Sequence, residues 1–170
     1  MASFAQEWVD LIDFDNRVLG KAPRRNIRAR NLLHRGVGIL VVNSAYEVYV
    51  HKRTDRKDVF PGLFDMFVGG VVASGETYEA AAAREVSEEL GVATTAPLER
   101  LFRHVYDGVL NRSVIDVFRV TWDGPIVHQE DEIAWGAWVR PDDLPAWVDG
   151  HEIVPDGLSV YRHYLGWASS

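Results

Sequence analysis

The sequence predicts an α/β protein with a mixed, partly antiparallel sheet, one long central helix and further helices near the C-terminus. The sheet is indicated by pairs of apolar, β-branched runs separated by turn-forming residues. The central helix is indicated by four consecutive alanines, Ala80–Ala83, within a stretch that has apolar residues at helical spacing. A chain of 170 residues can bury a core without disulfide bonds, so residues 1–170 are expected to form a single domain.

Two hairpins are predicted before the central helix. Residues Glu7–Asp13 alternate loosely between apolar and polar, and the pattern breaks at a turn before Val18–Gly20. The runs Gly36–Asn43 and Glu47–Arg53 form the second pair and are predicted to be core strands. The basic segment Lys21–Arg35 between the hairpins is interpreted as a solvated connector, with a phosphate-binding role as the alternative.

Further strands and helices are predicted after the second hairpin. A Pro61–Gly62 turn leads into a strand that ends in Gly69 and Gly70. The later elements follow from apolar runs, turn residues and helix-start signals. They are a hairpin at 98–106 and 113–122, a strand at 134–139, a short helix from Pro141, and a C-terminal helix from about Pro155 with a packing face of Leu158, Tyr161 and Leu165.

The central helix has clear start and stop signals. Thr77 can act as its N-cap, Glu79 lies in the positively polarised first turn, and Gly91 ends it. At about 100° per residue, three glutamate side chains project from one surface of this helix, next to an apolar stripe. These glutamates are Glu85, Glu88 and Glu89.

Three clustered carboxylates indicate a bound divalent cation. Carboxylates about 5 Å apart repel each other by roughly 3 kcal/mol per pair at an effective dielectric constant of about 20. An all-oxygen site suits Mg²⁺ or Mn²⁺, and the sequence has no cysteine that would select a softer metal. The six histidines show no metal-ligand spacing. The alternative interpretation is that the glutamates form a solvated helix face.

The stretch from Gly70 to Val92 resembles the Nudix box, the motif that defines the Nudix hydrolase superfamily. The pattern is Gly, five residues, Glu, seven residues, Arg-Glu, an aliphatic residue, any residue, Glu-Glu, any residue, Gly and an aliphatic residue. Its fixed positions are filled by Gly70, Glu76, Arg84, Glu85, Val86, Glu88, Glu89, Gly91 and Val92. The resemblance implies a Nudix-type α/β/α sandwich, with the box helix on one side of the sheet and the C-terminal helices on the other.

This resemblance also implies a reaction, the metal-dependent hydrolysis of a diphosphate bond in a substrate that joins the diphosphate to a group X. The metal, Mg²⁺ or Mn²⁺, would be held by Glu85, Glu88 and Glu89 and by the backbone carbonyl of Gly70. Arg84 would hold one of the acids in place. Nucleotide, sugar, prenyl and coenzyme-type diphosphates all remain candidates for the substrate.

The base that activates water is left open by the box. One candidate is Glu85 itself, and the others lie in a later acidic turn between two sheet segments, where Glu130 and Glu132 are preferred over the shorter Asp131. The alternative is that these three are solvated loop acids. Scattered aromatic residues are interpreted mainly as core, although Tyr106, Trp135 and Trp138 are also candidates for lining a pocket for X.

From about Glu7 to Leu165 the chain is also similar to the isopentenyl-diphosphate-isomerase-like branch of the superfamily. That likeness rests on a strand ending in Lys-Arg, then Phe-Pro-Gly, then the box. In the isomerases the residues matching Arg53 and Lys57 hold the substrate diphosphate, and the same role is expected here. However, Gly69 stands where the isomerases have a catalytic cysteine, and Val71 replaces a metal-binding histidine.

Isomerase activity is therefore not expected, because the proton donor and acceptor that it needs are incomplete. It is kept as an alternative, together with a catalytically silent module that binds a nucleotide or diphosphate. The intact acidic set argues against the silent module.

Composition restricts the partners and the location. A formal net charge of −7 argues against a general nucleic-acid or anionic-membrane surface. There is no apolar run long enough for a membrane span or signal peptide, and the absence of cysteine fits a reducing compartment. A cytoplasmic protein acting on a small-molecule diphosphate is expected. The sequence does not define the oligomeric state, and a homodimer stays open.

Overall fold

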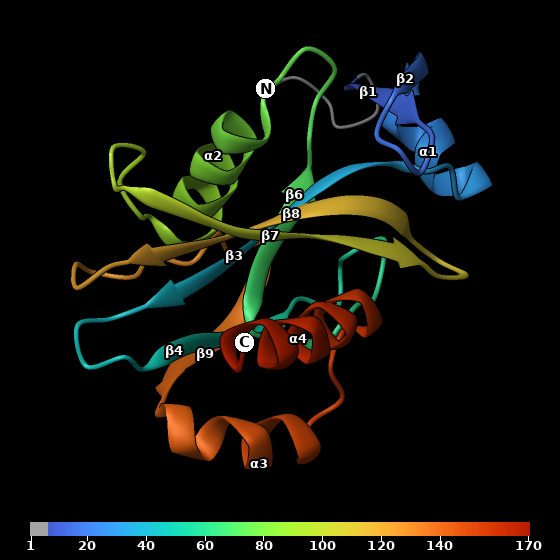
Figure 1. Ribbon diagram of the computed structural model, residues 1–170. Helices are drawn as coiled ribbons and strands as arrows, with labels where there is room; N and C mark the ends of the chain where they lie inside the picture. Colours follow the sequence, from blue (N-terminus) through green and yellow to red (C-terminus); the bar gives the residue numbers. More distant parts are fainter. Residues whose placement is uncertain (1–6) are drawn as a thin grey trace.

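The computed structural model describes residues 7–170, which form a mixed sheet with helices on both of its faces (Figure 1). The strands are β1 (Trp8–Ile12), β2 (Val18–Pro23), β3 (His34–Val42), β4 (Val48–Arg53), β5 (Phe64–Asp65), β6 (Phe67–Val71), β7 (Leu98–Asp107), β8 (Arg112–Thr121) and β9 (Ile133–Val139). The helices are α1 (Arg24–Arg30), α2 (Tyr78–Leu90), α3 (Leu144–Asp149) and α4 (Pro155–Ala168), with a 3-10 turn, η2 (Pro141–Asp143), before α3. The predicted α/β fold is confirmed.

Strand β3 is the centre of the sheet. It runs parallel to β8 and antiparallel to β6, and its first residue pairs with β1 of the β1–β2 hairpin. Strand β7 pairs with β8 as the predicted hairpin, and β4 pairs with β5 and β9. The predicted pairing of β3 with β4 is confirmed only at their connecting ends, where Val42 meets Val48. The central position of β3 brings β6, which carries Gly69 and Gly70, into the middle of the molecule.

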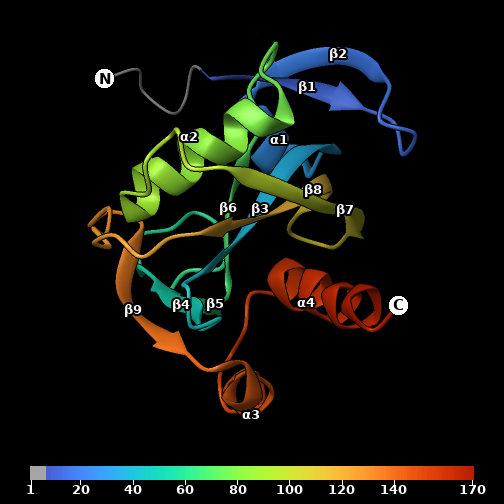
Figure 2. The ribbon, with the colours of Figure 1, turned by 60° about the vertical axis from the view of Figure 1, so that its left-hand side comes forward.

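The sheet has an apolar core on each face, because neighbouring strand residues point to opposite sides. On β3, Ile39 packs in the core under α2, whereas Leu40 packs in the core under α3 and α4. Helix α2 contributes Val86 and Leu90 to the first core, and α4 contributes Tyr161 to the second. The views in Figures 1 and 2 show α2 on one side of the strands and α3 and α4 on the other. The expected α/β/α layering is therefore present.

The central helix begins and ends as the sequence predicts. The Thr77 side chain accepts a hydrogen bond from the Ala80 amide at 3.1 Å, and Glu79 lies in the first turn. Gly91 ends α2 with φ of 72°, a left-handed conformation that glycine adopts without the steric cost of a Cβ atom. The acidic side of α2 is therefore positioned by local sequence signals at both ends.

The interpretation of residues 21–35 as a solvated connector is wrong. They complete β2, form α1 and begin β3. Helix α1 follows Pro23 and is capped at its C-terminal end by Asn31, which has a left-handed φ of 47°. Ile27 is the only α1 residue that is buried, so the sequence shows no apolar periodicity from which a helix could be predicted.

The C-terminal helices are present as predicted, but the packing face of α4 differs. Tyr161 is buried as expected, whereas Leu165 is 46% exposed. The buried residues of α4 are Gly157, Val160 and Tyr161. Tyr164 also packs against this core and Trp167 contacts Phe102 of β7, so the face of α4 that meets the sheet is rotated away from Leu165. None of the helices within residues 7–170 combines the length and hydropathy required to cross a membrane.

Candidate functional site

The acidic side of α2 faces the glycine pair at the end of β6. The side chains of Glu85 and Glu89 are buried there, while the Glu88 side chain is 52% exposed. A Cβ atom at Gly70 would overlap the Glu85 carboxyl group, so this position requires glycine for close approach of α2. Two of the three box acids, Glu85 and Glu89, are thus enclosed between α2 and the sheet, whereas the third, Glu88, is exposed.

Arg84 connects these acids to the loop before α2. Its guanidinium group donates to Glu76 at 2.8 and 3.0 Å, to a Glu85 oxygen at 2.6 Å, and to the Val71 carbonyl at 3.2 Å. It also lies 3.5 Å from a Glu88 oxygen. Arg84 therefore neutralises part of the acidic cluster and holds Glu85 in one orientation, as a partner that orients an acid should.

The two buried carboxyl groups have unfavourable surroundings for negative charge. Burial raises the pKa of Glu85, against the opposing effect of Arg84. Burial, followed by the Glu85 charge, raises the pKa of Glu89 to about 8, although Lys57 and Arg53 act in the opposite direction. Two adjacent carboxylates that resist ionisation are the electrostatic condition that a divalent cation relieves.

The residues around Gly70 fit a hard divalent cation. Carboxylate and carbonyl oxygens are the donors that Mg²⁺ and Mn²⁺ prefer, and the space left by the missing Gly70 side chain lies directly at the Glu85 carboxyl group. Within residues 7–170, no three carboxylate or histidine side chains already converge in ligand geometry. One Glu85 oxygen is bound to Arg84, so a cation would have to reorganise this pair.

Replacing Gly70 tests this close approach. We expect Gly70→Ala to lower the free energy of unfolding by about 1–3 kcal/mol and to weaken divalent-metal binding, because the added methyl group displaces the Glu85 carboxyl group. Chemical unfolding and metal titration measure the two effects. Gly69→Ala is the matched control for stability, since its Cβ would meet only the Val37 carbonyl oxygen, at 3.4 Å. Equal stability of the two variants would contradict the close approach.

The two predicted phosphate-binding cations, Arg53 and Lys57, both lie near this acidic cluster, but each already has protein partners. Arg53 donates to the Val59 carbonyl at 2.8 Å and to the Phe60 carbonyl at 3.1 Å, which holds the 54–60 loop. Lys57 forms an ion pair with Glu132. Burial, followed by the Arg53 charge, lowers the pKa of Lys57.

The acidic turn at 130–132 is attached to both the box helix and the 54–60 loop. The Gln129 amide donates to the Glu89 carbonyl at 3.0 Å, and Thr54 donates to the carbonyls of Asp131 and Glu132. Glu132 is partly buried through its pair with Lys57, whereas Glu130 is exposed. Asp131 pairs with Arg56 at 3.0 Å at the surface. Of the three candidate bases, Glu132 is thus the one tied to the acidic cluster, through Lys57.

Two cavities adjoin this cluster. The first, here named the basic pocket, has a volume of about 90 Å³ and is lined by Gly69, Gly70 and four cationic side chains, together with buried acids. The cations are Arg24, Arg28, Arg53 and Lys57, and the acids are Asp65 and Asp156. The second, here named the outer groove, has a volume of about 740 Å³. It is lined by Arg24, Arg25, Arg28, Ala29, Arg56, Lys57, Asp58, Asp131 and Glu132.

Sequence reasoning missed Arg24 and Arg28 as site residues. They lie four positions apart, so they project from the same side of α1, and both line the basic pocket and the outer groove. Their spacing would have predicted that they lie together if a helix had been predicted at 24–30. The sequence did not predict this helix, because residues 21–35 show no apolar periodicity.

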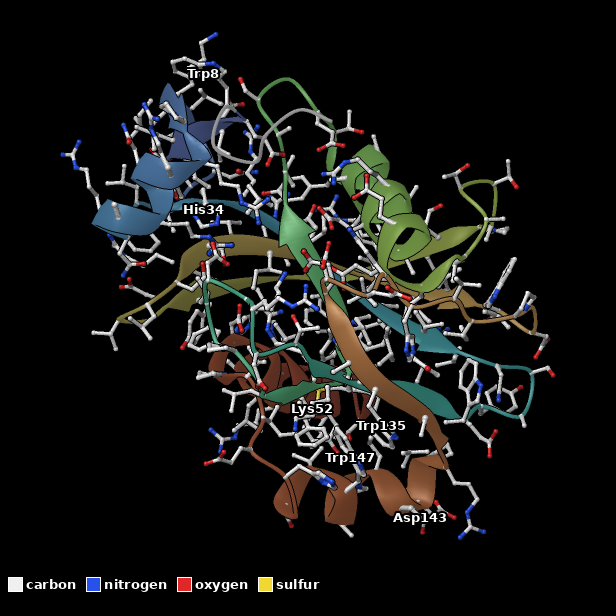
Figure 3. All side chains as sticks on the ribbon, turned by 180° about the vertical axis from the view of Figure 1, so that it is seen from behind. Trp8, His34, Lys52, Trp135, Asp143 and Trp147 are labelled. Atoms are coloured by element: carbon white, nitrogen blue, oxygen red, sulfur yellow. The ribbon has the colours of Figure 1, made fainter. Side chains whose placement is uncertain are left out.

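The three aromatic residues considered for an X pocket do not come together. Trp138 packs edge-on against Tyr49 in the core under α2, and Tyr106 packs in the core on the opposite face of the sheet. Trp135 packs edge-on against Phe64, with ring centroids 6.2 Å apart. Figure 3 shows Trp135 on the side of the strands where α3 lies. The interpretation of these residues as one pocket is wrong, and the cavities beside the acidic cluster are lined mainly by charged side chains instead.

The region that differs from the isomerases lies in the wall of the basic pocket. His34 is buried beside α1 and its Nδ1 donates to the Leu32 carbonyl at 2.9 Å (Figure 3). Burial lowers the pKa of His34 to about 4, so the ring is neutral at physiological pH. Gly69 and Val71 line the same pocket, and the chain contains no cysteine. The pocket therefore lacks the thiol that the isomerases place at this point.

The layered fold and the acidic helix face beside a glycine strand are those of a Nudix-type hydrolase. A family model described as "NUDIX domain" matches residues 32–157, and the chain belongs to this family. Two similar relatives are uncharacterized Nudix hydrolases. The one from Streptomyces coelicolor is 40% identical over 168 residues and covers 98% of this chain and 93% of its own. The one from Pseudomonas aeruginosa is 38% identical over 159 residues, covering 94% of each chain.

Solved structures agree with this assignment. The crystal structure of DR0079 from Deinococcus radiodurans aligns with a TM-score of 0.80 and 29% identity, covering 92% of this chain and 98% of that chain. The Nudix domain of Shewanella oneidensis NrtR, solved in complex with ADP ribose, aligns with a TM-score of 0.60 and 17% identity, covering 78% and 87%. The second likeness shows the fold alone. Membership of the isomerase-like branch is not established by these relatives.

Proposed function

We propose that this chain is a single-domain, divalent-metal-dependent hydrolase that cleaves a diphosphate bond in a small organic diphosphate. The observation that carries the proposal is the burial of Glu85 against Gly70 together with the burial of Glu89, whose carboxyl group is close enough to Arg53 and Lys57 for their charges to lower its pKa. One side of such a site suits a divalent metal and the other suits phosphate oxygens. The absence of cysteine fits a cytoplasmic location, and a homodimer stays a prediction.

The metal would be held by Glu85, Glu88 and Glu89 with the Gly70 carbonyl, and Mg²⁺ or Mn²⁺ suits this oxygen set. When bound, it supplies charge neutralisation at the phosphoryl oxygens and lowers the pKa of a coordinated water. Arg84 orients Glu85 through its 2.6 Å hydrogen bond and keeps its own position through Glu76.

Glu132 is the candidate base that best fits its surroundings. Without substrate, Lys57 neutralises the Glu132 carboxylate through an ion pair. An incoming phosphate group competes with Glu132 for the Lys57 ammonium. Transfer of Lys57 to the phosphate frees the Glu132 carboxylate to accept a proton from water. The water oxygen then bonds to phosphorus, the bridging P–O bond breaks, and the two products each carry one phosphoryl group. Glu130 remains the second candidate, although it is exposed.

Two other functions are less well supported. An isopentenyl-diphosphate-isomerase-like reaction requires a proton donor that Gly69 cannot supply and that no cysteine in the chain replaces. A silent binding module has no need for three acids and Arg84 around one glycine. No specific observation favours either alternative.

The direct test is phosphate or pyrophosphate release from a panel of nucleoside, sugar, prenyl and coenzyme-type diphosphates. Release is expected with Mg²⁺ or Mn²⁺ and not with EDTA. A variant with Glu85, Glu88 and Glu89 all changed to Gln is the control for contaminating phosphatases. Equal release by this triple variant, or no release from any diphosphate with either metal, would rule out the proposed reaction.

The phosphate-binding roles of Arg53 and Lys57 are tested by Ala substitution. Each variant is expected to bind substrate roughly ten- to a hundredfold more weakly, since a charge-assisted contact contributes about 1.5–3 kcal/mol. Metal affinity is expected to change less. Because Arg53 also holds the 54–60 loop, its thermal unfolding must be measured alongside. Wild-type kinetics in both variants would return these residues to the role of solvated loop cations.

A further inference from the structure

Arg28 lies at the junction of the basic pocket and the outer groove, and its charge is incompletely paired. Its side chain is only 22% exposed, and among the described residues its Nε atom has no hydrogen-bond partner. Nη1 donates to Asn111 at 3.3 Å, and the Asp58 carboxylate lies 3.7 Å from Nε. Burial, followed by the Arg24 charge, lowers the pKa of Arg28. A largely buried guanidinium with an unused donor is a position at which an anion would be stabilised.

The basic pocket concentrates like charges that repel each other. Arg24, Arg28, Arg53 and Lys57 all line it, although the whole chain carries a net negative charge. Arg53 lowers the pKa of both Arg28 and Lys57, which indicates that these cations are close enough to interact. An anion placed among them relieves this repulsion, as a cation does among the acids of α2.

Two acids also face the pocket and must be compatible with an anion there. Asp65 accepts a hydrogen bond from the Phe67 amide at 3.0 Å, and Asp156 accepts one from Asn111 at 2.9 Å. Burial raises the pKa of both, that of Asp65 to about 7. In its protonated form such a carboxyl group donates a hydrogen bond to an oxyanion and does not repel it.

The volumes of the two cavities decide which part of a substrate each accepts. The basic pocket, with about 90 Å³, is much the smaller cavity, and the four cations in its lining suit a phosphoryl group. The outer groove of about 740 Å³ lies within the range of roughly 300–1,000 Å³ that is typical of sites for organic ligands. Gly69 adds no side chain to the pocket that would fill this space.

We infer that the basic pocket binds the terminal phosphoryl group of the substrate and that Arg28 is a binding residue for its oxygens. The inference rests on the proposed function. The organic group X then lies in the outer groove. Substrates that end in an unsubstituted phosphoryl group are therefore expected to be preferred, because a terminal phosphoryl group carries more negative charge for these cations to bind than one that bears a second organic group.

The first test uses inorganic phosphate and needs no catalysis. Binding to the metal-free protein in EDTA is measured by calorimetry or by ³¹P NMR, for wild type, Arg28→Gln and Arg30→Gln. Arg30 is the matched control because it lies on the same helix, is exposed and lines neither cavity. We expect Arg28→Gln to bind phosphate at least tenfold more weakly and Arg30→Gln to bind it as wild type does. If Arg28→Gln fails to fold, Arg28→Lys serves instead, because it keeps the charge but loses the forked donor geometry.

The second test compares a nucleoside diphosphate with the corresponding nucleoside diphosphate sugar. In wild type, kcat/KM is expected to be at least tenfold higher for the nucleoside diphosphate, and Arg28→Gln is expected to reduce this ratio mainly through KM. Phosphate binding that is unaffected in Arg28→Gln, or a wild-type preference for the doubly substituted diphosphate, would overturn the inference. Arg28-dependent phosphate binding without hydrolysis of any diphosphate supports the pocket and refutes the proposed function. Metal-dependent hydrolysis of a diphosphate without phosphate binding in the pocket would support the proposed function and refute the assignment of the basic pocket.

Discussion

The Glu89→Gln variant is expected to lose at least about a thousandfold in metal-dependent turnover, because in the proposed function Glu89 holds a metal that would contribute several kcal/mol of transition-state stabilisation. Glu88→Gln is expected to lose activity for the same reason. The two differ in stability. Glu89 is buried beside Glu85, so its neutral amide should hold or raise the melting temperature of the metal-free protein, whereas the exposed Glu88 should change it little.

The pH dependence of this effect has a defined sign. Burial and the Glu85 charge raise the pKa of Glu89 to about 8 in the folded protein, from an ordinary value of 4.5. The folded state therefore binds this proton more tightly than the unfolded state, and Glu89 lowers the free energy of unfolding as pH rises from 4.5 to about 8. In EDTA, the melting temperature of Glu89→Gln should fall less steeply over this range than that of wild type. Full turnover in both Gln variants would contradict the assignment of Glu88 and Glu89 to the metal site. If the melting temperatures of wild type and Glu89→Gln changed equally with pH, the raised pKa of the buried Glu89 carboxyl group would be contradicted.

The Glu132→Gln variant is expected to lose roughly 10²–10⁴-fold in kcat while still binding metal and substrate, which is the effect of removing a general base. Lys57 pairs with Glu132, so removal of the carboxylate also frees the ammonium for phosphate. Substrate affinity in this variant should therefore stay the same or increase. Steady-state kinetics at saturating Mg²⁺, with direct binding of substrate to the inactive variant, separate the two effects.

Glu130→Gln and Asp131→Asn are the matched controls, because they remove one negative charge from the same turn. Glu130 is exposed and Asp131 pairs at the surface with Arg56, so both are expected to retain near wild-type turnover. A large loss of turnover in Glu130→Gln alone would indicate that Glu130 is the general base. Near wild-type turnover in all three variants would move the base to the box, where Glu85 is the remaining candidate.

Local sequence signals were sufficient to predict those features that depend on residues close together in the sequence. Thr77 and Gly91 define the ends of α2 because capping depends on a few adjacent residues, and helical spacing places Glu85, Glu88 and Glu89 on one side. The family motif and its hydrolase class were readable for the same reason, since nearly all its positions lie on one helix and the loops that flank it. Where packing depended on how a helix crosses the sheet, as for Leu165 in α4, the same periodicity was misleading.

The sequence alone determined the α/β class, the central helix with its three acids, and membership of the Nudix family. Only the tertiary structure decided which acids are buried, that Lys57 meets Glu132 across 75 residues, and that Arg28 of α1 joins Arg53 at one pocket. These pairings connect segments far apart in the chain, and neither spacing nor composition encodes them. They arise because β3 lies at the centre of the sheet and pairs with β6, so that α1 and the loops at 54–60 and 129–132 lie around the same pair of glycines. At this place burial determines which charge each side chain can hold.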